Sequence, residues 1–164
     1  MIRAIQKPDI ASVARIYNYY IENTIASYEE STLDSAGMTE RVQKVTEDGF
    51  PWLVAEIDGI IGGYSYGYMW NTRSAYRHSA EVTVYLLPDY YRKGIGTQLY
   101  QALFALLKEQ GIRMVIGGIG LPNPASVALH EKMGMKKVAH FEKVGRKFDQ
   151  WLDVGYWQGD LEFL

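Results

Sequence analysis

A short basic segment with two glycines, Tyr91 to Thr97 (YRKGIGT), has the composition of an anion-binding turn. The apolar, β-branched stretch 82–87 precedes it and predicts a strand. After it, apolar side chains recur at helical spacing as far as Gly111, which predicts a helix over residues 94–110. The first N–H groups of a helix have no partner within the helix, and the helix dipole is positive at that end. The segment is therefore predicted to bind a phosphate group.

Two common phosphate-binding motifs do not fit this segment. The G-x-G-x-x-G fingerprint of dinucleotide-binding proteins needs a third glycine, where the chain has Leu99. The P-loop motif, G-x-x-x-x-G-K followed by Ser or Thr, does not occur here. On these residues alone, an ordinary strand–turn–helix connection with glycines for tight packing is the alternative interpretation.

The other periodic segments predict the elements that must position this turn. They are a strand over 2–5, a helix opened by Pro8-Asp9, a loop over 24–35, a helix over 39–46, a hairpin of strands 52–57 and 60–69 with its turn at Asp58-Gly59, a strand over 112–119, a helix from Asn123-Pro124 to Gly134, and two strands within 136–157 joined near residues 145–148. This order predicts an α/β domain on a mostly antiparallel sheet, with one parallel crossover at the glycine turn.

Composition limits the class of protein. A length of 164 residues suits one domain, predicted over residues 1–164, and the 22% charged residues with a net charge of −2 show no basic bias toward nucleic acid. The absence of cysteine excludes disulfides, thiolate metal ligands and cysteine nucleophiles, and the three histidines show no metal-ligand spacing. No signal-peptide pattern or membrane-length apolar run is present, so we expect a soluble cytoplasmic protein without a membrane partner.

Four groups of residues occur in the order typical of one enzyme family. They are Ile16 to Asn18 with Thr24 to Glu29; Glu81 to Leu86 leading into the glycine turn; Leu121 to Ser126 with Leu129 to Gly134; and Gly145, Trp151 and Asp153 to Gln158. Together they resemble the phosphinothricin and methionine sulfoximine/sulfone N-acetyltransferases of the GNAT superfamily, and the resemblance spans essentially the whole chain. The chain departs from the family's Q/R-x-x-G-x-G/A turn at its first position, which is Tyr91.

The resemblance implies an α/β (α+β) GNAT fold with a mixed, mostly antiparallel central sheet, splayed central strands and about four flanking helices. Acetyl-CoA would lie between the splayed strands, and no metal is implied. The residues that the resemblance assigns to acetyl-CoA are Val84, Tyr85 and Leu86 for the pantetheine arm and thioester, Arg92, Lys93, Gly94, Ile95, Gly96 and Thr97 for the pyrophosphate, Asn123 for the cofactor arm, and Lys132 for a CoA phosphate. Asn123 is equally well explained as a helix N-cap, and Lys132 as a solvated lysine.

Acetyl transfer to an amine needs a base for the amine proton and stabilisation of the carbonyl oxygen, but no covalent nucleophile. The resemblance assigns the base to Glu81, and the alternative is a surface carboxylate paired with Arg77 or His78. Seven residues after Asn123, where many GNAT enzymes have a tyrosine that protonates the departing thiolate, this chain has His130. Imidazole titrates near neutrality and can do that work, although a lone helical histidine is also commonly structural.

The acceptor class follows from the resemblance together with the connection before Glu81. We predict that Arg73, Tyr76 and Tyr28 bind the acceptor, because a guanidinium pairs with a carboxylate or phosphinate and aromatic rings enclose a small side chain. The acceptor would be a small amino-acid-like amine attacked directly in a ternary complex, and the family implies a homodimer. Two rivals stay open: another acceptor amine, such as a peptide N-terminus or an antibiotic, and a non-catalytic acyl-CoA sensor.

Overall fold

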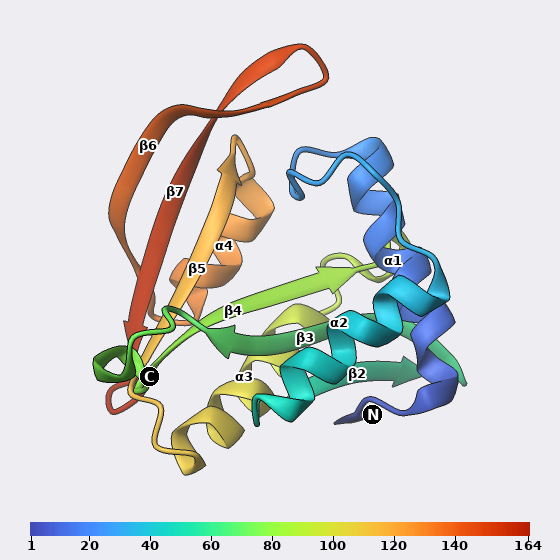
Figure 1. The fold of residues 1–164 in the computed structure, drawn as a ribbon, viewed down its shortest axis with the longest axis horizontal. Helices are drawn as coiled ribbons and strands as arrows, with labels where there is room; N and C mark the ends of the chain where they lie inside the picture. The colour runs from blue at the N-terminus through green and yellow to red at the C-terminus, as the bar shows by residue number, and fades with distance from the viewer.

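A seven-stranded sheet with the order β1-β2-β3-β4-β5-β7-β6 forms the centre of the computed structural model, which describes residues 1–164 (Figure 1). The strands are β1 Ile2–Ala4, β2 Trp52–Ile57, β3 Ile60–Met69, β4 Ser79–Leu86, β5 Met114–Leu121, β6 Lys136–Lys147 and β7 Gln150–Asp160. Only β4 and β5 pair in parallel; every other pair is antiparallel. The predicted mixed, mostly antiparallel sheet is thus confirmed.

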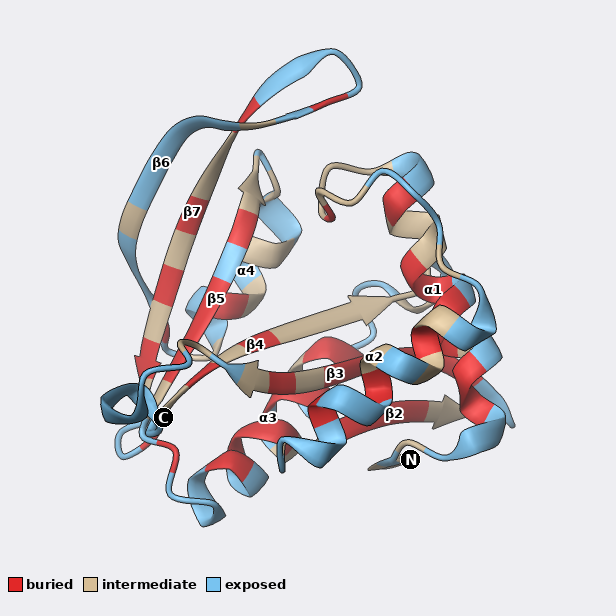
Figure 2. Ribbon diagram, viewed as in Figure 1, coloured by how far each residue is buried: buried red, intermediate tan, exposed pale blue.

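Four helices cover the sheet. They are α1 Ile10–Asn23, α2 Ser35–Glu47, α3 Ile95–Glu109 and α4 Pro124–Lys132, with short 3₁₀ turns at Lys7–Asp9, Ser74–Tyr76 and Pro88–Tyr90. The helices α1 and α2 pack in one core cluster with the Trp52 and Tyr64 face of the sheet, whereas α3 packs in a second cluster on the opposite face. Buried helix positions alternate with exposed ones in Figure 2, as expected for amphipathic helices.

The strands β4 and β5 pair over three residues only. Ser79 to Glu81 pair with Met114 to Ile116, and beyond Glu81 the two strands separate (Figure 1). In contrast, β3 pairs with β4 over seven consecutive residues, from Met69 opposite Ala80 to Gly63 opposite Leu86. The sheet therefore opens into a V whose vertex lies at Glu81, and the arm of β5, β7 and β6 forms its second side.

Several boundaries differ from the sequence prediction. The helix predicted over 39–46 begins at Ser35, because the Asp34 side chain caps it by accepting a hydrogen bond of 2.8 Å from the Gly37 N–H. The strand predicted over 82–87 begins at Ser79, and the last strand extends to Asp160. The turn of the final hairpin lies at Phe148 and Asp149, both with left-handed φ, at the end of the predicted range 145–148. No helix has the length and apolar character needed to cross a membrane.

Candidate active site

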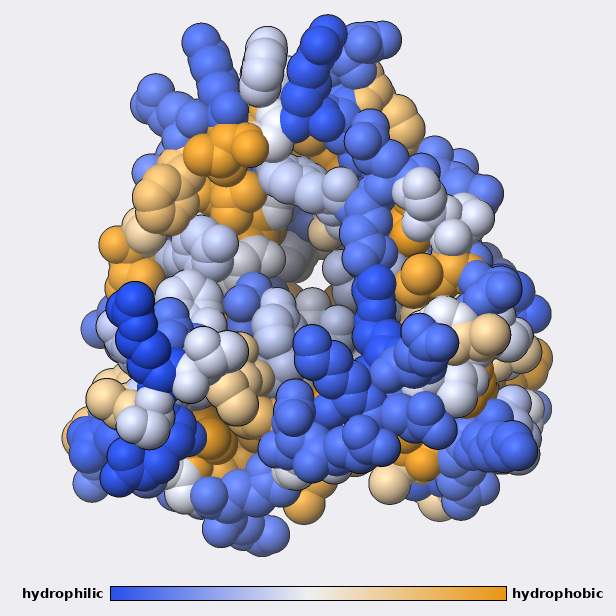
Figure 3. Space-filling view, in the orientation of Figure 1, coloured by the Kyte–Doolittle hydropathy of each residue, from blue (hydrophilic) through white to orange (hydrophobic).

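A cleft of about 880 Å³ lies between the separated strands (Figure 3 shows the hollow between the two arms). Four regions line it. They are the end of α1 and the following loop (Tyr20, Thr24 to Ala26), β4 (Val82 to Leu86), the glycine turn with the start of α3 (Tyr91, Arg92, Gly94 to Thr97, Tyr100), and β5 with α4 (Gly118 to Gly120, Pro122 to Ser126, Ala128 to His130, Lys132). The cleft thus brings together most of the residues that the sequence assigned to acetyl-CoA.

The glycine turn presents the N-terminus of α3 to this cleft. Gly94 is the N-cap residue and has a left-handed φ of 78°, a conformation that glycine adopts without strain. It has no side chain to cap the helix, and the first turn of α3 contains no acidic residue. The free N–H groups are therefore available to an anion. Lys93 does not line the cleft; its Nζ lies 5.5 Å from the centre of the Tyr90 ring.

The β4 wall offers backbone groups to the cleft. The Leu87 N–H donates to Gly62 O on the β3 side, so Leu86, one residue earlier, turns its backbone groups toward the cleft. These groups are occupied, because Tyr20 Oη accepts from the Leu86 N–H at 3.3 Å and donates to the Leu86 O at 2.6 Å. Val84 shares the orientation of Leu86 by the same alternation, and it lines the cleft together with Tyr85. Val84 is therefore the position best suited to hydrogen-bond a ligand.

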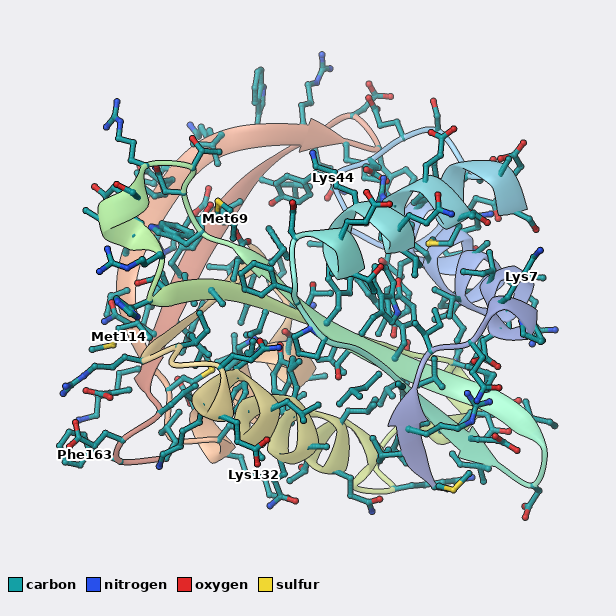
Figure 4. All side chains as sticks on the ribbon, turned by 60° about the horizontal axis from the view of Figure 1, so that its bottom comes forward. Lys7, Lys44, Met69, Met114, Lys132 and Phe163 are labelled. Atoms are coloured by element: carbon teal, nitrogen blue, oxygen red, sulfur yellow. The ribbon has the colours of Figure 1, made fainter.

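The helix α4 forms the opposite rim of the cleft. Asn123 is its N-cap, and Asn123 Oδ1 accepts a hydrogen bond of 3.1 Å from the Ser126 N–H, which leaves the side-chain amide N–H groups free. Lys132, at the other end of α4, is exposed and lines the cleft; Figure 4 shows it on the α3 side of the sheet. The N-cap interpretation of Asn123 is confirmed, and a contact with a ligand is compatible with it.

His130 lies at the floor of the cleft and is only 3% exposed. Its Nδ1 lies 2.7 Å from Ser126 O, which can only accept, so this nitrogen carries the proton; Nε2 then accepts from the Tyr100 hydroxyl at 3.0 Å. Burial lowers the pKa of His130, which keeps the ring neutral at neutral pH. A Cβ on Gly117 would collide with the imidazole. These contacts join α4 to α3 and pack it on β5, and they leave no N–H for a thiolate, so they do not favour His130 as the general acid.

Glu81 marks the vertex of the V. Its backbone pairs with Tyr68 on one side and Ile116 on the other. Burial raises the pKa of the Glu81 carboxyl above its usual value, and a hydrogen bond with Tyr68 partly opposes this. A Cβ built on Gly118 would lie 3.1 Å from the Tyr156 ring and 3.4 Å from Glu81 Oε1. Because Gly118 also lines the cleft, the carboxylate borders it. The alternative surface pairing of Glu81 with Arg77 or His78 is absent.

The predicted acceptor residues do not gather at Glu81. Arg73 and Tyr76 lie on or beside the exposed 3₁₀ turn Ser74–Tyr76 and do not line the cleft. Tyr28 is partly buried, and its hydroxyl donates to Asp153 O at 2.8 Å.

Two tyrosines that the sequence did not assign to the acceptor, Tyr68 and Tyr156, lie beside Glu81. Tyr68 is its partner on β3, and Tyr156 lies 5.8 Å, between ring centres, from both Trp70 and Phe141. The run Tyr64, Tyr66, Tyr68, with its period of two, was a signal that these rings share one face of a strand. The pairing of that strand with the Glu81 strand was not readable from the sequence.

The cleft between the splayed strands has a free helix N-terminus on one wall and a partly buried carboxylate at its vertex, an arrangement suited to an enzyme that binds an acyl-CoA. Residues 2–155 match the family model described as an acetyltransferase (GNAT) domain. The chain therefore belongs to the GNAT family of acetyltransferases, and it is an acetyl-CoA-dependent acetyltransferase, as predicted. No group of three or more histidine, cysteine or acidic side chains suited to a metal ion is present.

Three relatives match nearly the whole chain. The phosphinothricin N-acetyltransferase of Streptomyces viridochromogenes is 36% identical over 98% of this chain and 87% of its own length. The L-amino acid N-acyltransferase MnaT of Escherichia coli is 34% identical, and the L-methionine sulfoximine/L-methionine sulfone acetyltransferase of Salmonella typhimurium is 31% identical. Each of these two matches covers 98% of this chain and 94% of the relative. The resemblance seen in the sequence is thereby confirmed.

Solved structures share the fold closely. A phosphinothricin acetyltransferase from Sinorhizobium meliloti in complex with acetyl-CoA superimposes with a TM-score of 0.95 at 33% identity, covering 98% of this chain and 87% of that one. A ribosomal-protein-alanine N-acetyltransferase from Brucella melitensis gives 0.94 at 33% identity, covering 98% and 99%. The first of these two supports acetyl-CoA as the cosubstrate.

Proposed function

We propose that this enzyme acetylates the α-amine of a small amino-acid-like acceptor, of the phosphinothricin, methionine sulfoximine or methionine sulfone type. The amine attacks the thioester of acetyl-CoA directly in a ternary complex, because the chain has no cysteine to form a covalent acyl intermediate. In this proposal residues 1–164 act as a single domain, with acetyl-CoA along β4 and its pyrophosphate at the start of α3.

The position of Glu81 is the observation that carries this proposal. A ligand that lies along β4 with its phosphates at α3 points its other end toward the vertex of the V. Glu81 borders that end, and burial brings the pKa of its carboxyl closer to neutrality, which strengthens it as a base. Tyr68 and Tyr156 lie beside this carboxylate, and the Trp70 ring packs against Tyr156; these aromatic rings suit a small apolar or sulfur-containing side chain.

The second candidate acceptor is a peptide N-terminus. The similarity to the ribosomal-protein-alanine N-acetyltransferase favours it, since the superposition with that structure covers both chains almost completely. A peptide needs an open groove beyond the amine, whereas a free amino acid needs a group that pairs with its carboxylate. Arg73 is our proposal for that group, assisted by Tyr76, and both side chains are exposed.

The acceptor is tested by measuring the release of CoA thiol with methionine sulfone, methionine sulfoximine, phosphinothricin, ordinary amino acids, polyamines and alanine-terminated peptides. We expect the highest kcat/KM with the sulfone, sulfoximine and phosphinate compounds. A higher kcat/KM with the peptides would replace the proposal by the second candidate. Binding of acetyl-CoA without thiol release in the presence of any amine would indicate the non-catalytic sensor.

A homodimer is part of the proposal. The β6–β7 hairpin exposes Val138, Phe141, Val144, Phe148 and Trp151, each more than half accessible to solvent. Exposed apolar residues of this number on one hairpin suit contact with a second copy of the chain. Trp157, in contrast, is buried in the core and does not contribute to this surface. Light scattering of wild type and of Phe148→Ser with Trp151→Ser tests the dimer, and a monomeric wild type would refute it.

A further inference from the structure

Residues Thr24–Tyr28, which we call the strap, cross the open end of the V. The strap follows α1, and Figure 1 shows this loop facing the end of β5 across the opening. Its first three residues line the acetyl-CoA cleft. The strap therefore forms part of the wall on which a bound acetyl-CoA would lie.

One end of the strap is fixed to β4. Tyr20, in the last turn of α1, hydrogen-bonds both backbone groups of Leu86 through its hydroxyl. The Thr24 hydroxyl donates to Tyr20 O at 2.9 Å and accepts from the Ala26 N–H at 3.1 Å. The start of the strap is thus tied to the wall that carries the proposed pantetheine contacts.

The other end is fixed to the opposite arm by Tyr28. A Cβ on Gly120 of β5 would lie 2.8 Å from the Tyr28 ring, and a Cβ on Gly145 of β6 would collide with it, so the ring fills a space that only two glycines leave. The Tyr28 hydroxyl donates to the carbonyl of Asp153 on β7. Tyr28, which the sequence assigned to the acceptor, therefore joins the strap to three strands.

Lys147 is the charged part of this second attachment. It lies on β6, is 3% exposed, and its Nζ donates to Thr24 O at 2.9 Å and to Ser27 O at 2.6 Å. No carboxylate forms an ion pair with it, and burial lowers its pKa. A buried ammonium is costly unless its protons are hydrogen-bonded, and here the strap carbonyls supply those bonds. The strap in this position thus compensates for the burial of the charge.

We propose that Lys147 is a positioning residue for acetyl-CoA: it fixes the strap across the V and so sets the separation of the two walls of the cleft. It acts through the strap and does not itself line the cleft. The inference depends on acetyl-CoA binding and not on the identity of the acceptor, so it stands or falls separately from the acceptor that we propose.

The test is the affinity of Lys147→Met for acetyl-CoA, measured by calorimetry without any acceptor. Methionine keeps the unbranched, apolar part of the side chain but leaves both strap carbonyls without their donor. We expect the Kd for acetyl-CoA to rise about tenfold, equivalent to about 1.4 kcal/mol. Hydrogen exchange of the strap amides should accelerate in the same variant. Lys136→Met is the matched control, because Lys136 is exposed on the same strand and forms no hydrogen bond or ion pair.

A second variant separates positioning from stability. Tyr28→Phe keeps the ring between the glycines and removes only the bond to Asp153, so it should fold even if Lys147→Met does not, and we expect about a threefold rise in Kd. If both variants keep the wild-type Kd for acetyl-CoA and only their melting temperatures fall, these residues contribute to stability alone, and the proposal is overturned. A rise in Kd with unchanged exchange of the strap amides would overturn it as well.

Discussion

Replacing Glu81 with glutamine removes the proposed base and keeps the shape of the side chain. The carboxylate borders the cleft at Gly118 but does not line the cofactor wall, so the Kd for acetyl-CoA should change by less than about twofold. A general base contributes about 10²- to 10⁴-fold to a rate, so kcat for the preferred acceptor should fall by that factor. This corresponds to about 3–5 kcal/mol of transition-state stabilisation.

The same substitution has a consequence for stability, and its sign follows from the pKa. Burial raises the pKa of Glu81 in the folded state above its value in the unfolded chain. Between these two values the folded state binds more protons, so ionisation of Glu81 lowers the free energy of unfolding as the pH rises through the folded-state pKa. Glu81→Gln should therefore be more stable than wild type at neutral pH, and the difference should disappear below the unfolded-state pKa.

The measurements are the pH profile of kcat/KM and urea denaturation at several pH values. In wild type, kcat/KM should rise as the pH increases through the raised pKa of Glu81. This rise should be absent from the pH profile of the variant. Glu109→Gln is the control, because Glu109 is exposed at the far end of α3 and forms no hydrogen bond or ion pair. If Glu81→Gln keeps the wild-type kcat, or if its kcat/KM rises with pH in the same way as that of wild type, Glu81 is not the base.

Three further predictions concern single contacts. Arg73→Ala should raise the KM for the acceptor without changing the KM for acetyl-CoA. If the variant and wild type have the same KM for the acceptor, Arg73 does not bind the acceptor carboxylate. Tyr91→Gln should change the Kd for acetyl-CoA by less than about fivefold. The exposed Tyr91 hydroxyl forms a hydrogen bond only with the hydroxyl of Tyr20, and such a bond is worth about 1 kcal/mol. A large gain in affinity would show that the tyrosine weakens the binding of acetyl-CoA at this turn. Asp9→Asn should lower the free energy of unfolding by about 3 kcal/mol, because it breaks a bidentate pair of a buried carboxylate with Arg3. Arg3 holds the pKa of Asp9 below its usual range, so this loss should be full at neutral pH and shrink as the pH falls through that pKa, as denaturation in acid would show.

Local patterns predicted the parts of the site that neighbouring residues build. The glycine turn before α3 and the N-cap at Asn123 depend on residues within a few positions of one another, and both have the backbone structure that the sequence indicates. The helix that begins at Ser35 was predicted four residues short, because its capping residue Asp34 lies in a polar stretch that resembles a loop. His130 shows the limit of such patterns: its spacing from Asn123 matched a catalytic position, yet its two ring nitrogens are engaged by Ser126 and Tyr100.

The sequence by itself determined the order of the elements, the basic glycine turn and the carboxylate that enters the central strand. Only the tertiary structure decided what surrounds them. Hydrogen bonds join residues that are far apart in the sequence: Tyr20 and Leu86 are 66 residues apart, Thr24 and Lys147 are 123 apart, and Tyr28 and Asp153 are 125 apart. Helix and strand periodicity reports which side of its own element a residue lies on, but not which distant segment packs against that side. That depends on the path of the whole chain, here on the separation of β4 and β5 and on the strap that joins their ends.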